Sequence, residues 1–420
     1  MPKTLAQKLL QMHTTDEVRE DGQIVQCQVS LVLANDITGP LAIKSFHGMG
    51  ATKVFDRDKI VLVMDHFTPQ KDIASANQVM ISRKFAAEQA LTHYYEGGNC
   101  GVEHTLLPEQ GLVGPGDLVI GADSHTCTYG GLGAFATGMG STDIAAAMAL
   151  GETWLKVPPS IRVEYVGTMG GDLRAKDLIL LLIGEIGVDG ALYQALEFTG
   201  PLIANLPVEG RLTMANMAIE AGAKVGLFAC DAETRKYCAL HGQAGSVTEL
   251  AADPGASYVR EVKLDLTGLG PVVACPHLPG NVKPVAELSN LPIEQVVIGS
   301  CTNGRLSDLR DAAEILRGRK VHPKVRCIIL PSTPTVWRAA LKEGLIEIFM
   351  EAGCIVGPCT CGPCLGGHLG ILGDGERAVS TSNRNFKGRM GSLNSEVYLA
   401  SPLVAAASAV AGEVMGPAKL

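Results

Sequence analysis

The chain has 420 residues, of which 46% are hydrophobic and 19% are charged. The charged share lies below the roughly 25% usual for soluble domains, and the 49 glycines amount to about 12% of the chain against a usual share of about 7%. This composition excludes a disordered, collagen-like or coiled-coil chain, and the length predicts a well-buried globular protein of about two to four domains.

The net charge is −8, from 35 basic and 43 acidic residues. A nucleic-acid partner is not expected, because no basic run is present to meet a phosphate backbone. The N-terminus lacks the apolar core of a signal peptide, and the longest uncharged apolar runs are far shorter than the roughly 18 residues of a membrane span. We therefore expect a cytoplasmic protein with no membrane segment, and a small acidic substrate remains compatible with this charge.

The first part of the chain alternates strand and helix patterns. We expect strands over Ile24–Ala34, Lys59–Met64 and Asp117–Ala122, and helices near Pro40–Phe46, from about Asp72 to Tyr95, and from about Ser141 to Leu155. Strands that alternate with helices predict a mostly parallel, doubly wound sheet. The run Val157-Pro158-Pro159 predicts a boundary, so the first domain is expected to span residues 1–157.

Two further α/β units are expected after this boundary. The second, residues 158–284, is predicted to contain a strand over Ile161–Val166, helices near Ala175–Ile186 and Thr213–Lys224, and a connector over Gly268–Pro284. The third, residues 285–420, is predicted to contain strands over Gln295–Gly299 and Lys324–Leu330 and a helix over Thr335–Ala352. The motif Gly-x-Gly-x-x-Gly and the Walker A pattern are absent from the sequence, which counts against a nucleotide cofactor.

Three of the predicted strands stop at a polar cluster. These clusters are Asp65-His66, Asp123-Ser124-His125-Thr126 and Cys301-Thr302-Asn303-Gly304. Ligands of open α/β sheets bind beyond the carboxyl ends of strands, so the clusters predict one composite site between domains. A carboxylate beside an imidazole sets its tautomer and raises its pKa, although neighbouring Asp and His also occur by chance. His104 is a similar candidate, and its alternative is a loop histidine that caps backbone groups.

Cysteines gather near the C-terminus as Cys354, Cys359, Cys361 and Cys364. The Cys-x-x-Cys pair is compatible with a zinc clip, a redox pair or an iron–sulfur cluster. A closed zinc site usually takes four ligands from two paired motifs, and only one such pair is present, so Cys301 is the natural third ligand. Three thiolates on a four-iron cluster leave one iron free to act as a Lewis acid. The spacing does not select the trio, so Cys354 and Cys359 remain alternatives.

A polar, glycine-ended loop over residues 381–389 carries Arg384 and Arg389. Paired guanidinium groups bind carboxylates through two parallel hydrogen bonds each, which predicts an anion-binding loop. The alternative is a solvated surface loop with salt bridges.

Taken together, these motifs resemble the aconitase superfamily, most closely the large subunits of its two-subunit members. The resemblance covers nearly the whole chain. Its motifs are Asp65-His66, Gly121–Thr126, Tyr129–Asp143, Glu209-Gly210-Arg211, Asn216–Ala223, Gly299–Arg305, Cys359–Gly367 and Ser382–Arg389. The fold that this resemblance implies is α/β, with three α/β/α domains of the aconitase type packed around an iron–sulfur cluster.

The resemblance also implies a role for each candidate residue. It implies one 4Fe-4S cluster, with one iron not ligated by protein, held by Cys301, Cys361 and Cys364 and flanked by Asn216 and Asn383. The implied substrate-binding residues are Asp123, Ser124, His125, Arg384 and Arg389. The implied catalytic residues are Asp65, His66, His104, Asp123, His125 and Glu220, with His104 and Glu220 as one acid–base pair.

The reaction implied by the resemblance is reversible dehydration and rehydration of a hydroxy di- or tricarboxylate through a cis-enoic acid. Hydroxide is a poor leaving group, so it must be polarised by a metal and protonated by an acid. One departure concerns the early loop, where many relatives have His or Gln before Asp and this chain has Asn35-Asp36; substrate contact by Asn35 is left open.

Full-length aconitases carry a fourth, swivelling domain with a base serine and further substrate arginines, whereas this sequence stops at Leu420. The resemblance therefore implies a separate small subunit that supplies these groups. Two rival functions are an electron-transfer iron–sulfur protein, which leaves the strand-end Asp-His pairs unexplained, and an RNA-binding regulator, which the charge of −8 disfavours.

Overall fold

The structure is a computed structural model that describes residues 1–243, 250–288 and 290–420. The described strands form a five-stranded, a four-stranded and a seven-stranded sheet and one two-stranded ribbon. The fold is therefore mixed α/β with largely parallel sheets, as the sequence predicts. Among the described residues, no helix combines the length and apolar character that a membrane crossing requires.

The five-stranded sheet is parallel throughout, in the order β4-β3-β2-β5-β6. Its strands are β2 (Leu31–Asn35), β3 (Ile60–Val63), β4 (His93–Tyr95), β5 (Leu118–Gly121) and β6 (Phe135–Gly138), and its helices are α2 (Gly39–Gly48), α3 (Ile73–Glu88), α4 (Glu103–Glu109) and α5 (Ser141–Leu150). Strands β2, β3 and β5 are buried at every position, as in a parallel sheet covered on both faces. The chain leaves β2 toward β3 on one side and returns as β5 on the other, so a topological switch point lies at β2.

The four-stranded sheet is also parallel, in the order β10-β9-β8-β11. Its strands are β8 (Ser160–Val166), β9 (Ala195–Thr199), β10 (Val225–Phe228) and β11 (Arg260–Asp265). The helices between them are α6 (Ala175–Ile186), α7 (Pro201–Ala204), α8 (Val208–Asn216) and α9 (Ala232–Leu240), with the 3-10 turn η3 (Met217–Ala221) after α8. The run α8–η3 brings Asn216 and Glu220 toward the neighbouring sheets.

The seven-stranded sheet has the order β13-β12-β18-β17-β14-β15-β16, parallel from β18 to β16 and antiparallel at β12 and β13. Its strands are β12 (Val272–Ala274), β13 (Val282–Pro284), β14 (Gln295–Ile298), β15 (Arg326–Ile329), β16 (Ile355–Val356), β17 (Arg377–Ser380) and β18 (Glu396–Leu399). Its helices are α10 (Leu306–Leu316), α11 (Pro334–Lys342), α12 (Leu345–Ala352) and α13 (Pro402–Ala411). Strand β14 lies between β15 and β17, which makes it a second switch point.

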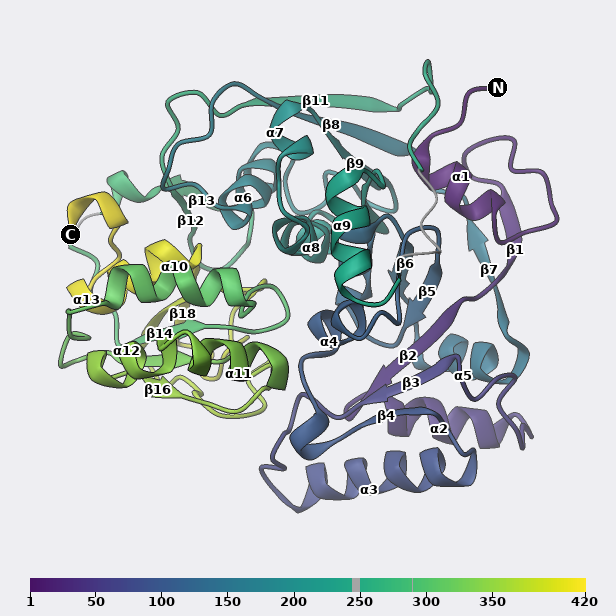
Figure 1. The fold of residues 1–420 in the computed structure, drawn as a ribbon, viewed down its shortest axis with the longest axis horizontal. Coiled ribbons are helices and arrows are strands. Elements are labelled where there is room, and N and C mark those ends of the chain that lie inside the picture. Colours follow the sequence, from purple (N-terminus) through teal and green to yellow (C-terminus); the bar gives the residue numbers. More distant parts are fainter. Residues whose placement is uncertain (244–249, 289) are drawn as a thin grey trace.

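The three sheets lie around a common centre (Figure 1). In that view the seven-stranded sheet with α10–α13 lies at the left, β8 and β11 run along the top, and α2, α3 and α5 lie at the lower right. Near the N-terminus, α1 (Leu5–Gln11) and the antiparallel ribbon of β1 (Ile24–Gln28) and β7 (Glu152–Lys156) lie along the right side.

Three predicted elements of the first unit were wrong in extent. The predicted strand Ile24–Ala34 is two strands in different sheets, because β1 pairs with β7 and only β2 enters the parallel sheet. The predicted helix Asp72–Tyr95 ends at Glu88, since Ala90 adopts a positive φ of 52° and β4 follows. The helix predicted to reach Leu155 ends at Leu150, where Gly151 forms a left-handed cap before β7.

Three elements of the later units also differ from their predictions. The helix predicted over Thr213–Lys224 begins earlier, as α8, and gives way to η3 after Asn216. The predicted connector Gly268–Pro284 contains β12 and β13, which pair with each other and join the third sheet. The helix predicted over Thr335–Ala352 is interrupted at Gly344, whose left-handed conformation separates α11 from α12.

The 3-10 segment η2 (Ser124–Leu132) joins the first sheet to the second through backbone contact. It follows the strand end that carries Asp123, and its Gly130 lies directly against the carbonyl oxygen of Gly226 in β10. Gly131 lies close to the backbone of α8, where an added Cβ would come within 2.7 Å of the Leu212 nitrogen. Only glycine allows this approach, so these two positions set where Ser124 and His125 lie.

We therefore expect Gly130→Ala to destabilise the protein by roughly 2 kcal/mol or more. The alanine methyl group would overlap the carbonyl oxygen of Gly226, which is held in place by the pairing of β10 in its sheet. Thermal or urea unfolding measures the loss. Gly48→Ala is the matched control, since nothing lies within 4 Å of its added Cβ. Equal stability of the two variants would contradict the assigned packing.

Candidate active site

A cavity of about 450 Å³ lies where the carboxyl ends of β2, β3 and β5 face the ends of β14 and β17. Every predicted site residue except Glu220, Asn216 and Asn383 lines it. The structure thus brings together three strand-end clusters, the cysteines and the arginine loop. Two switch points that face each other explain this, because each one opens a crevice at the carboxyl ends of its strands.

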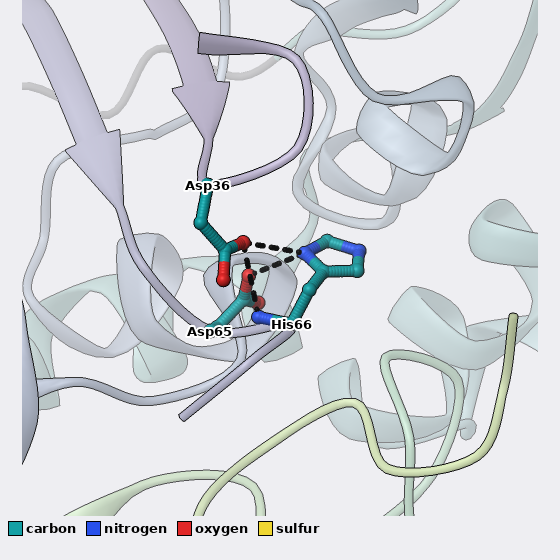
Figure 2. A group of neighbouring side chains, drawn as sticks. All are labelled: Asp36, Asp65 and His66. Carbon is teal, nitrogen blue, oxygen red and sulfur yellow. Dashed lines mark hydrogen bonds and ion pairs between the residues drawn. The ribbon is translucent and has the colours of Figure 1, made fainter. Parts of the chain in front are cut away.

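Two carboxylates face the same nitrogen of the His66 imidazole (Figure 2). Its Nδ1 is 2.8 Å from Asp65 Oδ1 and 3.3 Å from Asp36 Oδ1, and the other ring nitrogen points away from both. Asp36 also accepts the backbone N–H groups of His66 and Phe67, at 3.2 and 2.8 Å. Burial lowers the pKa of His66, but the charge of Asp65 and the contacts with both carboxylates outweigh burial and raise that pKa well above its ordinary value. This imidazole is therefore charged at neutral pH and presents Nε2–H to the cavity.

The Asp123 carboxylate connects two other histidines. Its Oδ1 is 3.1 Å from His104 Nε2 and accepts the backbone N–H of His125 at 2.7 Å. Burial raises the pKa of Asp123, but the hydrogen bonds from His104 and His125 outweigh burial and bring it well below the usual value. Asp123 is therefore an anion at the cavity wall, 3.8 Å from His66 Nε2.

The structure gives His104 and Glu220, the acid–base pair that the resemblance implies, different hydrogen-bond partners. His104 contacts Asp123 through Nε2 and the hydroxyl of Tyr129 through Nδ1, at 3.2 Å. Glu220 instead lies 2.9 Å from His125 Nε2 and accepts a hydrogen bond from Arg384 Nε at 2.8 Å. Glu220, a buried carboxylate of the second sheet unit, thus holds in place His125 of the first unit and Arg384 of the third.

The thiols of Cys301, Cys361 and Cys364 form one buried group at the cavity, packed with Val102. Hydrogen bonding from Cys361 lowers the pKa of Cys301 well below its usual value and lowers that of Cys364 to about 6. The other two candidates lie elsewhere: Cys359 lines a different cavity, and Cys354 interacts with Cys327.

Two asparagine amides surround this thiol group. Asn383 Nδ2 donates to Cys301 Sγ at 3.1 Å and to Asn216 Oδ1 at 3.0 Å, and Cys364 Sγ donates to Asn383 Oδ1 at 3.5 Å. The donor set is three converging sulfur atoms beside an open cavity, and the amide N–H of Asn383 is directed at one of them. These residues fit an iron–sulfur cluster held by three thiolates.

Arg384 and Arg389 both reach the cavity from the loop after β17. Arg389 Nε is buried and has no hydrogen-bond partner among the described residues. A buried guanidinium nitrogen without an acceptor is costly unless a ligand supplies one. The arginine loop is therefore suited to bind a carboxylate, and it is not a solvated surface loop.

Sequence reasoning missed three buried residues at the site. Asp36 follows Asn35, whose contact with substrate the sequence left open, and it contacts His66. Glu103 lines the cavity beside His104. Lys176, on α6, donates through Nζ to the carbonyl oxygens of Thr381 and Ser382 and so anchors the arginine loop. A strand-end position was a signal for Asp36, but no sequence signal pointed to Lys176, which is the second residue of α6.

Two groups of acids and histidines bring potential metal-ligand atoms within 4.8 Å of one another: Asp36, Asp65 and His66, and Glu103, His104 and Asp123. Their ligand atoms are largely engaged in contacts with one another and with backbone N–H groups. These contacts raise the pKa of His66 and lower that of Asp123.

This fold and this site define a protein of the aconitase type. The sequence model of the family described as "Aconitase family (aconitate hydratase)" matches residues 7–412. The chain belongs to the aconitase family, for which an iron–sulfur cluster is expected.

Relatives match over their full length. A protein of Desulfovibrio desulfuricans is 76% identical and one of Nitratidesulfovibrio vulgaris is 70% identical, each over 100% of both chains. One of Moorella thermoacetica is 58% identical over 99% of both chains. All three are called "3-isopropylmalate dehydratase large subunit". Among solved structures, aconitase X of Thermococcus kodakaraensis matches with a TM-score of 0.52 and 15% identity, covering 88% of this chain and 87% of its own, which supports the fold alone.

We expect Asp65→Asn to lower the pKa of His66 toward the ordinary value of about 6.5, because the variant removes the nearer carboxylate charge. NMR titration of protein with labelled histidine measures the change: the His66 signal should stay that of an imidazolium through neutral pH in the parent and titrate near neutrality in the variant. Exposed Asp374→Asn is the control. If His66 of the parent protein already titrated at about pH 6.5, the pKa of an unperturbed histidine, the raised pKa assigned to His66 would be refuted.

Proposed function

We propose that this chain is the large, cluster-bearing subunit of a 3-isopropylmalate dehydratase. This hydro-lyase interconverts 2- and 3-isopropylmalate in leucine biosynthesis by removing and re-adding water. The alternatives are a homoaconitase large subunit and dehydratases of dimethylmalate or methylcitrate. The observation that carries the proposal is full-length identity of 58 to 76% to relatives of that name, and the site chemistry agrees with it.

Cys301, Cys361 and Cys364 are proposed to hold one 4Fe-4S cluster, with one iron not ligated by protein. The convergence of their buried thiols supports this assignment, as do the amides of Asn216 and Asn383 beside them. When bound, such a cluster supplies a Lewis acid that polarises a hydroxyl oxygen. Thiolates of this kind suit a reducing cytoplasm, which we propose as the compartment.

His66 is the proposed acid that protonates the departing hydroxyl group. Asp65 and Asp36 keep its imidazole charged and fix Nδ1, so the proton at Nε2 is the one available to the cavity. A hydroxide ion is a poor leaving group, and protonation as it departs converts it to water. In the reverse direction the same nitrogen accepts a proton from water.

Arg384 and Arg389 are the proposed carboxylate binders, with Ser124 and His125 as further substrate contacts. Guanidinium groups bind carboxylates bidentately and stabilise negative charge that develops next to them. Glu220 orients His125 and Arg384 together, which links the substrate contacts of the first and third sheets. His104 and Asp123 form the remaining acid–base pair.

The name "large subunit" that the relatives carry implies a small-subunit partner. We propose that this partner carries a swivelling domain with the base serine and further substrate contacts. No nucleic-acid or membrane partner is proposed. We also propose that residues 1–157, 158–284 and 285–420 act as three domains, each built on one of the large sheets, with β12 and β13 extending the third sheet.

The cysteine assignment predicts which variants lose iron. Cys301→Ser, Cys361→Ser and Cys364→Ser should each abolish a stable cluster, measured as iron and sulfide content and visible absorbance after anaerobic reconstitution. Cys359→Ser is the matched control from the same loop and should retain the cluster. Loss of iron in the control alone, or zinc in anaerobically prepared protein, would contradict the assignment.

The activity is tested by anaerobic co-expression with the small subunit and a panel of hydroxy acids followed by enoate absorbance. We expect turnover of isopropylmalate by the two-subunit complex, little turnover by the large subunit alone, and loss of activity after mild oxidation. Robust turnover by the purified large subunit alone would refute the need for the partner. A fully assembled iron–sulfur cluster whose spectrum does not change when substrate is added would favour the electron-transfer alternative.

A further inference from the structure

Glu103 is a buried acid at the active site for which the proposed reaction has so far provided no role. It is the first residue of α4, is 1% exposed, and lines the cavity next to His104. Its backbone N–H donates to Asp65 Oδ2 at 2.8 Å, so its position relative to the Asp65–His66 pair is fixed. Its carboxyl group faces the same space as the substrate-contacting residues.

The amide of Asn35 identifies which carboxyl oxygen of Glu103 accepts a hydrogen bond. Asn35 Oδ1 accepts the backbone N–H groups of Ile37 and Thr38 and the hydroxyl of Thr38, at 3.1, 3.1 and 2.9 Å. These three donors fix the amide orientation, so Asn35 Nδ2 must face Glu103. It donates to Glu103 Oε1 at 3.1 Å, which makes Oε1 the carbonyl-like acceptor oxygen.

The second oxygen, Oε2, is buried and has no hydrogen-bond partner among the described residues. The titratable groups that face the side chain are the carboxyl groups of Asp65 and Asp123 and the imidazoles of His66 and His104. His104 Nε2 lies 3.5 Å from Glu103 Oε1 but nearer to Asp123, at 3.1 Å. No arginine or lysine bonds to Glu103 among the described residues, so an ionised carboxylate here is poorly compensated.

The electrostatic environment points in the same direction. Burial raises the pKa of Glu103 well above its usual value, and the charges of Asp65 and Asp123 raise it further. The charge of His66 and the hydrogen bond from Asn35 lower the pKa of Glu103, but burial and the two carboxylates outweigh them. A position at the start of a helix also favours a carboxylate, although α4 has only 7 residues.

We propose that Glu103 is an uncharged carboxylic acid in the resting site and that its Oε2–H donates a hydrogen bond to an oxygen of the bound hydroxy acid or enoate. This rests on the proposed function. An uncharged donor contacts an anionic substrate without adding negative charge to a wall that already contains Asp36, Asp65 and Asp123. Asn35 and Glu103 then act as a pair, in which the amide positions the acid.

The test compares Glu103→Gln with Glu103→Leu in the two-subunit complex. Glutamine keeps an acceptor for Asn35 and an N–H donor in place of Oε2–H, so it should retain kcat/KM for isopropylmalate within about threefold. Leucine has neither, and should lower kcat/KM by about 10- to 100-fold. Glu109→Gln, at the other end of α4 and outside the cavity, is the control. Thermal unfolding of each variant separates a loss of function from a loss of fold.

Infrared difference spectroscopy of the large subunit tests the protonation state without any turnover. Subtracting the Glu103→Gln spectrum from the parent spectrum at neutral pH should leave the C=O stretch of a protonated carboxyl group; its absence would overturn the proposal. Glutamine as damaging as leucine, or leucine as active as the parent, would overturn it as well. An inactive parent complex would instead refute the proposed function, while the infrared result would still decide the state of Glu103.

Discussion

Burial of ionisable side chains is the constraint on which this structure depends. An unpaired charge in a protein interior costs several kcal/mol, so each buried group at the cavity must find a partner or lose its charge. The Asp65 and Asp36 carboxylates keep His66 charged, His104 and His125 keep Asp123 ionised, and Glu220 balances His125 together with Arg384. The protonation states of these side chains therefore depend on which residues the three sheets bring next to one another.

The three sheet units that form this arrangement meet through buried polar contacts as well as through apolar packing. Lys176 reaches from α6 to the carbonyl groups under the arginine loop, and Asn216 bridges Thr128, Thr302 and Asn383. At Gly130 the backbones of the first and second units approach so closely that an added Cβ would lie 1.9 Å from the Gly226 carbonyl oxygen. A substrate held by groups from all three units is consequently oriented by the fold as a whole.

Much of the fold was predictable from local patterns, and the failures have a common cause. Fully buried strands such as β3, β5 and β14 were found because parallel strands read as continuous apolar runs. Predicted helices ran too long where a left-handed residue stops them, as at Gly151 and Gly344, because periodicity does not report backbone conformation. The split of residues 24–34 was missed because strand pairing with β7 depends on residues more than a hundred positions away.

The amino-acid sequence by itself determined the inventory of the site: acid–histidine pairs and a cysteine at strand ends, a Cys-x-x-Cys pair, and two arginines in one loop. Only the tertiary structure decided how these groups pair. It separated Cys359 and Cys354 from the converging thiols, assigned Glu220 to His125 instead of His104, and added Asp36, Glu103 and Lys176. The physical reason is that hydrogen bonds and ion pairs act over a few ångströms between residues far apart in the chain, and only the packed sheets bring such residues within that distance.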